Sequence, residues 1–264
     1  SITRYKSIGE IIMNKKPIVA GNWKMNKHPE EGFSFVGEIQ DLLLDINHVS
    51  VIFAPPFTGL FEMNVNPPFY SAAQNCHWEN SGAFTGEISV SMIKDCGANY
   101  VIIGHSERRH IFKESDDWVN KKLISVINNG LNPILCVGET LDQRESGQTD
   151  QVLHDQLEKG LVGIDSIKDC IIAYEPVWAI GTGLTADNKQ IQLAHKAIRD
   201  ILSSTLKGAN DIQILYGGSV NSVNAEDLIQ VPGVDGFLIG GASLDIESFT
   251  SIARTVEMVQ EKKI

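Results

Sequence analysis

The sequence predicts an α/β protein that folds as one closed (β/α)8 barrel domain, and three observations support this. The chain has 264 residues, and barrels of this class commonly occupy about 250 residues as a single unit. Eight short and almost wholly apolar runs recur along it, as expected for parallel strands that are covered on both faces. Amphipathic stretches separate most of these runs, and no linker or shift in composition divides the chain.

The eight runs expected to form strands are rich in valine, isoleucine and alanine. In chain order they are residues 18–20, 49–54, 69–73, 100–103, 133–137, 170–174, 212–216 and 237–239. Their spacing of roughly 20 to 40 residues is the spacing that βα units require. A doubly wound open sheet is the alternative, since eight βα units do not by themselves prove closure.

Three of the intervening stretches place apolar residues at a helical period, which predicts helices that pack on the sheet. Such a stripe belongs to the core far more often than to a cofactor site. The three predicted core stripes are Phe33, Val36, Ile39, Leu42 and Leu43; Ile191, Leu193, Ala194, Ala197, Ile198, Ile201 and Leu202; and Phe249, Ile252, Ala253, Val256 and Val259.

Composition excludes several classes of function. The formal charge is −11, which argues against nonspecific binding to nucleic acid or to anionic membranes. No apolar stretch approaches the ~20 residues of a membrane helix, and residues 1–12 lack the apolar segment of a secretory signal. We interpret residues 1–12 as an N-terminal extension or a cloning remnant, and residues 13–264 as the barrel domain. The four widely spaced cysteines predict reduced thiols in a cytoplasmic protein, with no zinc cage.

A carboxylate at the end of the sixth predicted strand is the first candidate catalytic group. Glu175 ends an apolar run and is followed by residues 176–183, in which a proline stiffens one end and Gly-Thr-Gly frees the other. A carboxylate beside a segment that can exclude water is a candidate general base. If Glu175 is considered alone, the alternative is that its carboxylate forms an ion pair at the protein surface.

Polar residues also follow the first and fourth predicted strands. Lys24, in a turn with Asn22, is a candidate cation for an anionic or polarised substrate; a solvated loop lysine is the alternative. Ser106 is a plausible N-cap with Glu107 in the first turn, so we expect His105 near a helix N-terminus, which disfavours imidazolium. A histidine that only bonds to backbone is the alternative, and the histidine spacing does not indicate a metal site.

Glycine pairs follow the last two predicted strands. Gly217-Gly218-Ser219 and Gly240-Gly241 stand where barrels often bind phosphate through backbone N–H groups, although ordinary turns also use such pairs. Residues 181–186 match G-x-G-x-x-A, but the match lies six residues beyond Glu175, whereas a dinucleotide fingerprint follows its strand directly. We therefore predict no NAD site.

The motifs at these strand ends resemble those of the triosephosphate isomerase family. They are GNWKMN at 21–26, GAFTGE at 82–87, IGHSERR at 103–109, CVGET at 136–140, AYEPVWAIGTG at 173–183, YGGS at 216–219 and GFLIGGASL at 236–244. Their order and spacing follow the family from about Met13 to the C-terminus.

The resemblance implies a TIM barrel that interconverts dihydroxyacetone phosphate and glyceraldehyde 3-phosphate, in glycolysis and gluconeogenesis, without metal or organic cofactor. It also implies a homodimer that pairs through the loop containing Thr85. The site residues that it implies are Glu175 as the base that carries the proton; His105 as the group that acts on the substrate oxygens; Lys24 with Asn22 as the stabilisers of negative charge; Glu107 as a support for Lys24 or for the His105 loop; and Gly181, Ser219, Gly240 and Gly241 as the phosphate site.

Two other functions are weighed against the isomerase. A barrel aldolase would use Lys24 as a Schiff base, but the sequence around Lys24 shows no feature that would lower its pKa. A non-catalytic phosphate-binding barrel would be expected to lack either the base or the cation, and both Glu175 and Lys24 are present.

Overall fold

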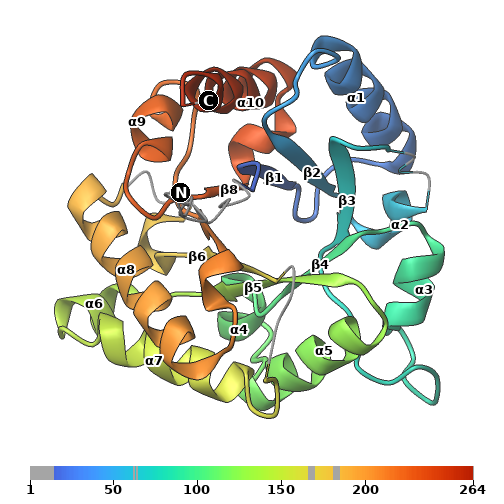
Figure 1. Ribbon diagram of the computed structural model, residues 1–264. Helices are drawn as coiled ribbons and strands as arrows, with labels where there is room; N and C mark the ends of the chain where they lie inside the picture. Colours follow the sequence, from blue (N-terminus) through green and yellow to red (C-terminus); the bar gives the residue numbers. More distant parts are fainter. Residues whose placement is uncertain (1–14, 62, 64, 166–169, 181–184, 264) are drawn as a thin grey trace, which may run out of the picture.

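A computed structural model describes residues 15–61, 63, 65–165, 170–180 and 185–263 (Figure 1). Eight parallel strands follow one another in chain order around a closed barrel. They are β1 (Ile18–Asn22), β2 (Ser50–Ala54), β3 (Phe69–Ala73), β4 (Tyr100–Ile103), β5 (Asn132–Val137), β6 (Ile171–Tyr174), β7 (Gln213–Tyr216) and β8 (Gly236–Ile239). The predicted (β/α)8 barrel is confirmed, and each predicted strand is found within two residues of its expected bounds.

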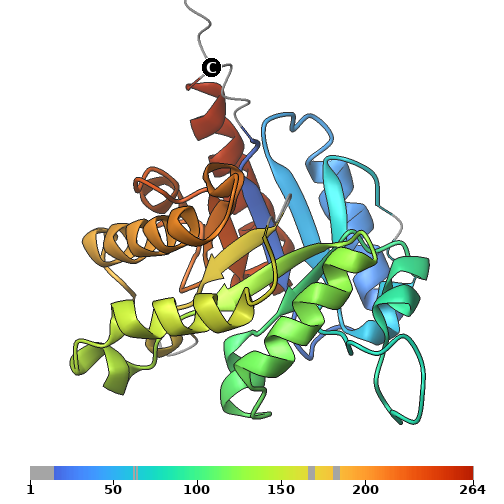
Figure 2. The ribbon, with the colours of Figure 1, turned by 60° about the horizontal axis from the view of Figure 1, so that its bottom comes forward.

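Helices surround the barrel on the outside (Figures 1 and 2). The α-helices are α1 (Pro29–Leu42), α2 (Phe57–Leu60), α3 (Val90–Asp95), α4 (Ser106–His110), α5 (Asp116–Asn128), α6 (Leu141–Glu145), α7 (Thr149–Gly160), α8 (Asn188–Thr205), α9 (Ala225–Ile229) and α10 (Ile246–Glu261). Short 3₁₀ turns are η1 (Val177–Ala179), η2 (Ala209–Asp211) and η3 (Gly241–Leu244). The helices connect successive strands, so the chain alternates between the wall of the barrel and its outer layer.

Pairing of the last strand with the first closes the barrel and excludes the open-sheet alternative. In the register of β1 and β8, Ile18 lies opposite Gly236 and Gly21 opposite Ile239. Gly236 has φ +143°, and a Cβ there would lie 2.0 Å from the carbonyl oxygen of Ile18. Only glycine permits this close approach of the two backbones, so Gly236 contributes directly to closure.

The apolar core has two parts because successive strand residues point to opposite faces. Ile18 and Ala20 belong to a cluster inside the barrel, together with residues such as Ile102 and Leu215. Val19 belongs to a larger cluster between the strands and the helices. Burial on both faces is what the unbroken apolar runs predicted.

The predicted core stripes are correct for the last helix and partly wrong for the other two. Phe33 is 60% exposed, Leu42 47% and Leu193 58%, although all three were predicted to be core. Helical residues are separated by about 100°, which places Phe33 roughly a third of a turn, and Leu193 nearly half a turn, from the centre of the buried face of its helix. Phe35 is buried on α1 instead.

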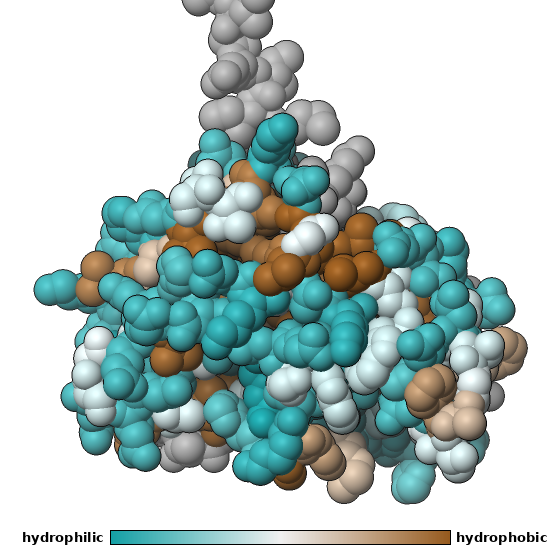
Figure 3. Space-filling model, turned by 90° about the horizontal axis from the view of Figure 1, so that it is seen from below, coloured by the Kyte–Doolittle hydropathy of each residue, from teal (hydrophilic) through white to brown (hydrophobic). Residues whose placement is uncertain are grey.

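The outer surface is mostly hydrophilic on the face seen in Figure 3, where hydrophobic residues gather near the upper end of the view. Among the described helices, none has both the length and the apolar content to cross a membrane. Residues 1–12, which we interpreted as an N-terminal extension or a cloning remnant, lie outside the described residues.

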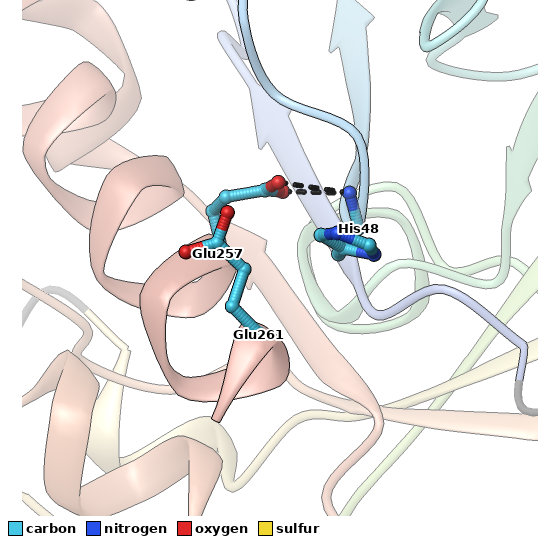
Figure 4. A group of neighbouring side chains, drawn as sticks. All are labelled: His48, Glu257 and Glu261. Atoms are coloured by element: carbon cyan, nitrogen blue, oxygen red, sulfur yellow. Dashed lines mark hydrogen bonds between the residues drawn. The ribbon is translucent and has the colours of Figure 1, made fainter. Parts of the chain in front are cut away.

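The last helix is tied to the loop before β2 at the end of the barrel where the strands begin (Figure 4). The buried carboxylate of Glu257 accepts hydrogen bonds from the backbone N–H groups of Asn47 at 2.7 Å and His48 at 2.8 Å. Side-chain ligand atoms of His48, Glu257 and Glu261 lie within 4.8 Å of one another. These two N–H groups provide hydrogen-bond partners for the buried carboxylate of Glu257. We therefore interpret the contact as structural.

A buried histidine makes the stability of the barrel depend on pH. His195 on α8 is fully buried, and its Nδ1 lies 2.8 Å from the carbonyl oxygen of Gly233. Burial lowers the pKa of His195 from 6.5 to about 4. Between these values the unfolded chain binds a proton that the folded chain does not, so stability falls as the pH drops from 6.5 towards 4.

We expect the free energy of unfolding at pH 4.5 to be lower than that at pH 7 by about 2–3 kcal/mol through this residue alone. Urea unfolding at fixed protein concentration, followed at both pH values, measures the difference. His195→Gln should remove most of that pH dependence. An unchanged dependence in the variant would contradict the assignment to His195.

Candidate active site

One pocket opens at the end of the barrel where the strands terminate, as predicted for functional groups in this fold. Its volume is about 240 Å³, enough for a small metabolite. The described residues that line it are Asn22, Lys24, His105, Glu175, Ile180, Gly217, Gly218, Ser219, Val220, Leu238, Gly240, Gly241 and Ala242. Residues from the ends of β1, β4, β6, β7 and β8 therefore meet around one cavity.

Glu175 follows β6 directly and is 3% exposed. Its backbone N–H donates to the carbonyl of Val137 at 2.8 Å, which extends the pairing of β6 with β5. One carboxylate oxygen lies 2.9 Å from Nε2 of His105, and the other accepts the backbone N–H of Ser106 at 2.9 Å. The carboxylate is thus buried and held by two polar partners.

His105 stands at the N-terminus of α4, where the structure corrects one prediction. The N-cap is His105 itself and not Ser106, because Nδ1 of His105 accepts the backbone N–H of Glu107 at 3.2 Å. A ring nitrogen that accepts a hydrogen bond carries no proton. The remaining nitrogen, Nε2, is therefore the donor to Glu175.

The His105–Glu175 pair shifts both pKa values. Burial alone would raise the pKa of Glu175, but His105, the Ser106 N–H and Lys24 hold it below its ordinary value. Burial alone would lower the pKa of His105, but the Glu175 carboxylate raises it, which is opposite to the direction expected from the helix N-terminus. These shifts favour an ion pair, whereas the Glu107 N–H requires an unprotonated Nδ1. We assign the neutral Nε2–H ring, because a protonated Nδ1 would leave that N–H without its acceptor.

Lys24 lies in a turn after β1 that side chains hold in place. Its φ of 55° is in the left-handed region, which is uncommon for a residue other than glycine. The side-chain oxygen of Asn22 accepts the backbone N–H of Lys24 at 3.1 Å. The side-chain amide of Gln74 donates to the backbone carbonyl of Lys24 at 2.8 Å. Nζ of Lys24 forms an ion pair with Glu107 at 2.6 Å. Glu107 itself is not among the described pocket-lining residues, so it contacts the site through Lys24 and His105.

The predicted phosphate residues lie at the ends of β7 and β8. Gly240 is next to the stem of Lys24, because a Cβ there would lie 3.4 Å from Cε of that lysine. A Cβ at Gly241 would meet no protein atom within 4 Å, so the space beside it is open to a bound group. The hydroxyl of Ser219 donates to the carbonyl of Ala179 at 2.8 Å. Gly181, the fourth predicted phosphate residue, lies outside the described residues.

Three contacts of the site were missed by the sequence reasoning. The Ser106 N–H holds the carboxylate, Gln74 holds the turn of Lys24, and the amide of Gln156 bonds to Gly138 beside Glu175. Gln74 follows the end of β3 directly, which is a signal of the same kind that identified Lys24. Gln156 lies within a helix and carries no such signal.

The family model described as triosephosphate isomerase matches residues 17–256 of the chain. The chain belongs to the triosephosphate isomerase family. The match includes every candidate residue from Asn22 to Gly241.

Relatives in the triosephosphate isomerase family match the chain over nearly their whole length. The triosephosphate isomerase of Syntrophotalea carbinolica is 46% identical over 247 residues, which cover 91% of this chain and 98% of that protein. The enzyme of the same name from Carboxydothermus hydrogenoformans is 47% identical over 247 residues, with the same coverage of both chains. The similarity therefore covers nearly the whole of these two relatives.

Proposed function

We propose that this chain interconverts dihydroxyacetone phosphate and D-glyceraldehyde 3-phosphate by proton transfer through an enediol(ate). Family membership supports this reaction. The observation that carries the mechanism is the meeting of a carboxylate, an imidazole and an ammonium around one pocket of about 240 Å³. These are the groups that abstraction of a proton next to a carbonyl requires: a base, an acid for the oxygen and a positive charge.

Glu175 is proposed as the base that moves the proton between the two carbons. In the structure the carboxylate of Glu175 bonds to His105 and to the Ser106 N–H, so it must leave both partners to reach a substrate carbon. A substrate oxygen that accepts the Nε2–H of His105 would replace the carboxylate as its partner. Binding of substrate would thereby release the base at the moment when it is needed.

His105 and Lys24 are proposed to act on the substrate oxygens. The neutral ring can donate its Nε2–H to the carbonyl oxygen, and Lys24, with Asn22, can stabilise the negative charge that develops there. Glu107 pairs with Lys24 at 2.6 Å and donates its N–H to His105, which supports both of the roles expected for it. An ammonium held in an ion pair has no free electron pair for a Schiff base, which disfavours the aldolase alternative.

The phosphate is proposed to bind at Ser219, Gly240 and Gly241, with Gly181 of the segment that follows Glu175. The open space beside Gly241 supports this role, as does the stem of Lys24 beside Gly240. Backbone N–H groups and one lysine can hold a phosphate dianion even on a chain with a formal charge of −11.

An assay with D-glyceraldehyde 3-phosphate, coupled to reduction of dihydroxyacetone phosphate, tests the function. We expect full activity after dialysis against EDTA, because each proposed step uses side chains of the chain itself. Run in D₂O, the reaction should place deuterium on the product carbon, since an abstracted proton can exchange with solvent. A dialysed protein that is inactive would contradict the proposal.

We also propose that the chain forms a homodimer through the loop that contains Thr85. The loop between β3 and α3 is exposed around Thr85 and carries Phe84 at 42% exposure. Such exposed apolar groups suit a homodimer interface. Sedimentation equilibrium should give twice the chain mass, and Thr85→Glu should shift the protein towards monomer. A monomeric wild-type protein would contradict this part of the proposal.

We also propose that the reaction serves glycolysis and gluconeogenesis in the cytoplasm. All four cysteines are free thiols, which suits a reducing compartment.

A further inference from the structure

A side-chain amide on an outer helix pairs with the backbone beside the proposed base. Gln156 lies on α7, and its Oε1 accepts the N–H of Gly138 at 2.8 Å. Its Nε2 donates to the carbonyl of the same glycine at 3.1 Å. Both backbone polar groups of Gly138 are therefore bound to one side chain, which fixes the position and the rotation of this residue.

Gly138 in turn packs directly on the backbone of Glu175. A Cβ at Gly138 would lie 1.7 Å from the carbonyl oxygen of Glu175 and 3.2 Å from its Cα. On either side of Gly138, the N–H of Glu175 donates to Val137 and the N–H of Val177 donates to Glu139. Gly138 is thus the central residue of the segment against which Glu175 rests.

We propose that Gln156 is a positioning residue for Glu175. It acts through Gly138, and it is not among the described residues that line the pocket. The inference rests on the proposed role of Glu175 as the base. Because Gly138 has no side chain and touches Glu175 through its backbone, a displacement of Gly138 is transmitted directly to the main chain that carries the carboxylate.

Only an amide of this length serves both groups of Gly138, since it offers one acceptor and one donor. Methionine has a similar shape but would leave the N–H and the carbonyl without partners. Glutamate could accept the N–H, but its second oxygen would repel the carbonyl unless the carboxyl group carried a proton. These differences allow a positioning role to be separated from simple packing.

The first test compares Gln156→Met with wild type in the coupled assay. We expect kcat to fall about tenfold or more, because small displacements of a base cost large factors in rate. KM should stay within about twofold, since Lys24 and the phosphate residues are on other strands. Gln213→Met is the matched control: Gln213 donates to the carbonyl of Lys16 at 2.9 Å, at the opposite end of the barrel, and its loss should leave kcat unchanged.

The second test uses Gln156→Glu and the ratio of its kcat to that of wild type between pH 8 and pH 5.5. We expect this ratio to rise as the pH falls, because a protonated carboxyl group can again donate to Gly138. In a Glu175→Gln background, Gln156→Met should cause no further loss.

A wild-type kcat in Gln156→Met would overturn the inference, as would a ratio that does not change with pH or an equal loss in Gln213→Met. The proposed function is tested separately: if the wild type is active and Glu175→Gln is inactive, the proposed function stands even where the role of Gln156 is overturned. If Gln156→Met does not fold, the pH dependence of Gln156→Glu decides alone.

Discussion

Replacing Glu175 by glutamine should lower kcat by about three orders of magnitude or more, since general-base catalysis typically contributes 10²–10⁴-fold. An amide of the same size can still fill the buried site but cannot accept a proton. KM should change little, because other residues bind the phosphate and the oxygens. Initial rates in both directions, at several substrate concentrations, separate kcat from KM.

Glu175→Asp withdraws the carboxylate by about one C–C bond, and a misplacement on the order of 1 Å can cost about 100-fold in rate. We therefore expect a large loss of kcat here as well. Glu257→Gln is the matched control, because Glu257 is also a buried carboxylate that accepts backbone N–H groups, at the other end of the barrel. Near-normal kcat in either Glu175 variant would refute the role of the base.

Replacing Lys24 by alanine should weaken binding and turnover together. The ammonium lies in the pocket beside Gly240, where it can attract the phosphate and stabilise the developing oxyanion. Loss of one charged hydrogen bond costs roughly 1.5–3 kcal/mol, or about 10- to 100-fold in affinity. A similar factor in kcat is expected from the loss of transition-state stabilisation.

Lys196→Ala is a suitable control for Lys24→Ala. Lys196 also forms an ion pair, with Asp200 at 2.5 Å, but it lies on the exposed surface of α8. Replacement of Lys196 should leave kcat and KM unchanged. Lys24→Ala with wild-type kcat and KM would show that the cation is not part of the site.

The barrel could be predicted because its strands are buried on both faces. Runs such as residues 69–73 and 100–103 were placed with correct bounds, since short and almost wholly apolar runs that alternate with amphipathic stretches are typical of parallel strands covered on both faces. The helices were harder: Phe33 and Leu193 are apolar but exposed. A single apolar residue beside a stripe does not reveal whether a neighbouring element covers it.

The candidate site could be predicted as far as local chain direction determines it. Residues that follow parallel strands meet at one end of a barrel, so Lys24, His105 and Glu175 were expected together and line one pocket. The partners of these groups depend on side-chain conformation. His105 caps its own helix, and Glu175 raises the pKa of His105. Both effects follow from three-dimensional contacts that periodicity does not encode.

The strand ends and strand starts of this protein perform separate tasks. The proposed chemistry is confined to one rim, while the Glu257 contacts and the beginning of β1 occupy the other. New chain ends introduced by circular permutation would therefore be best tolerated in the short connections that lead into strands, such as residues 129–131 between α5 and β5. Such a rearranged polypeptide would keep its catalytic rim uninterrupted.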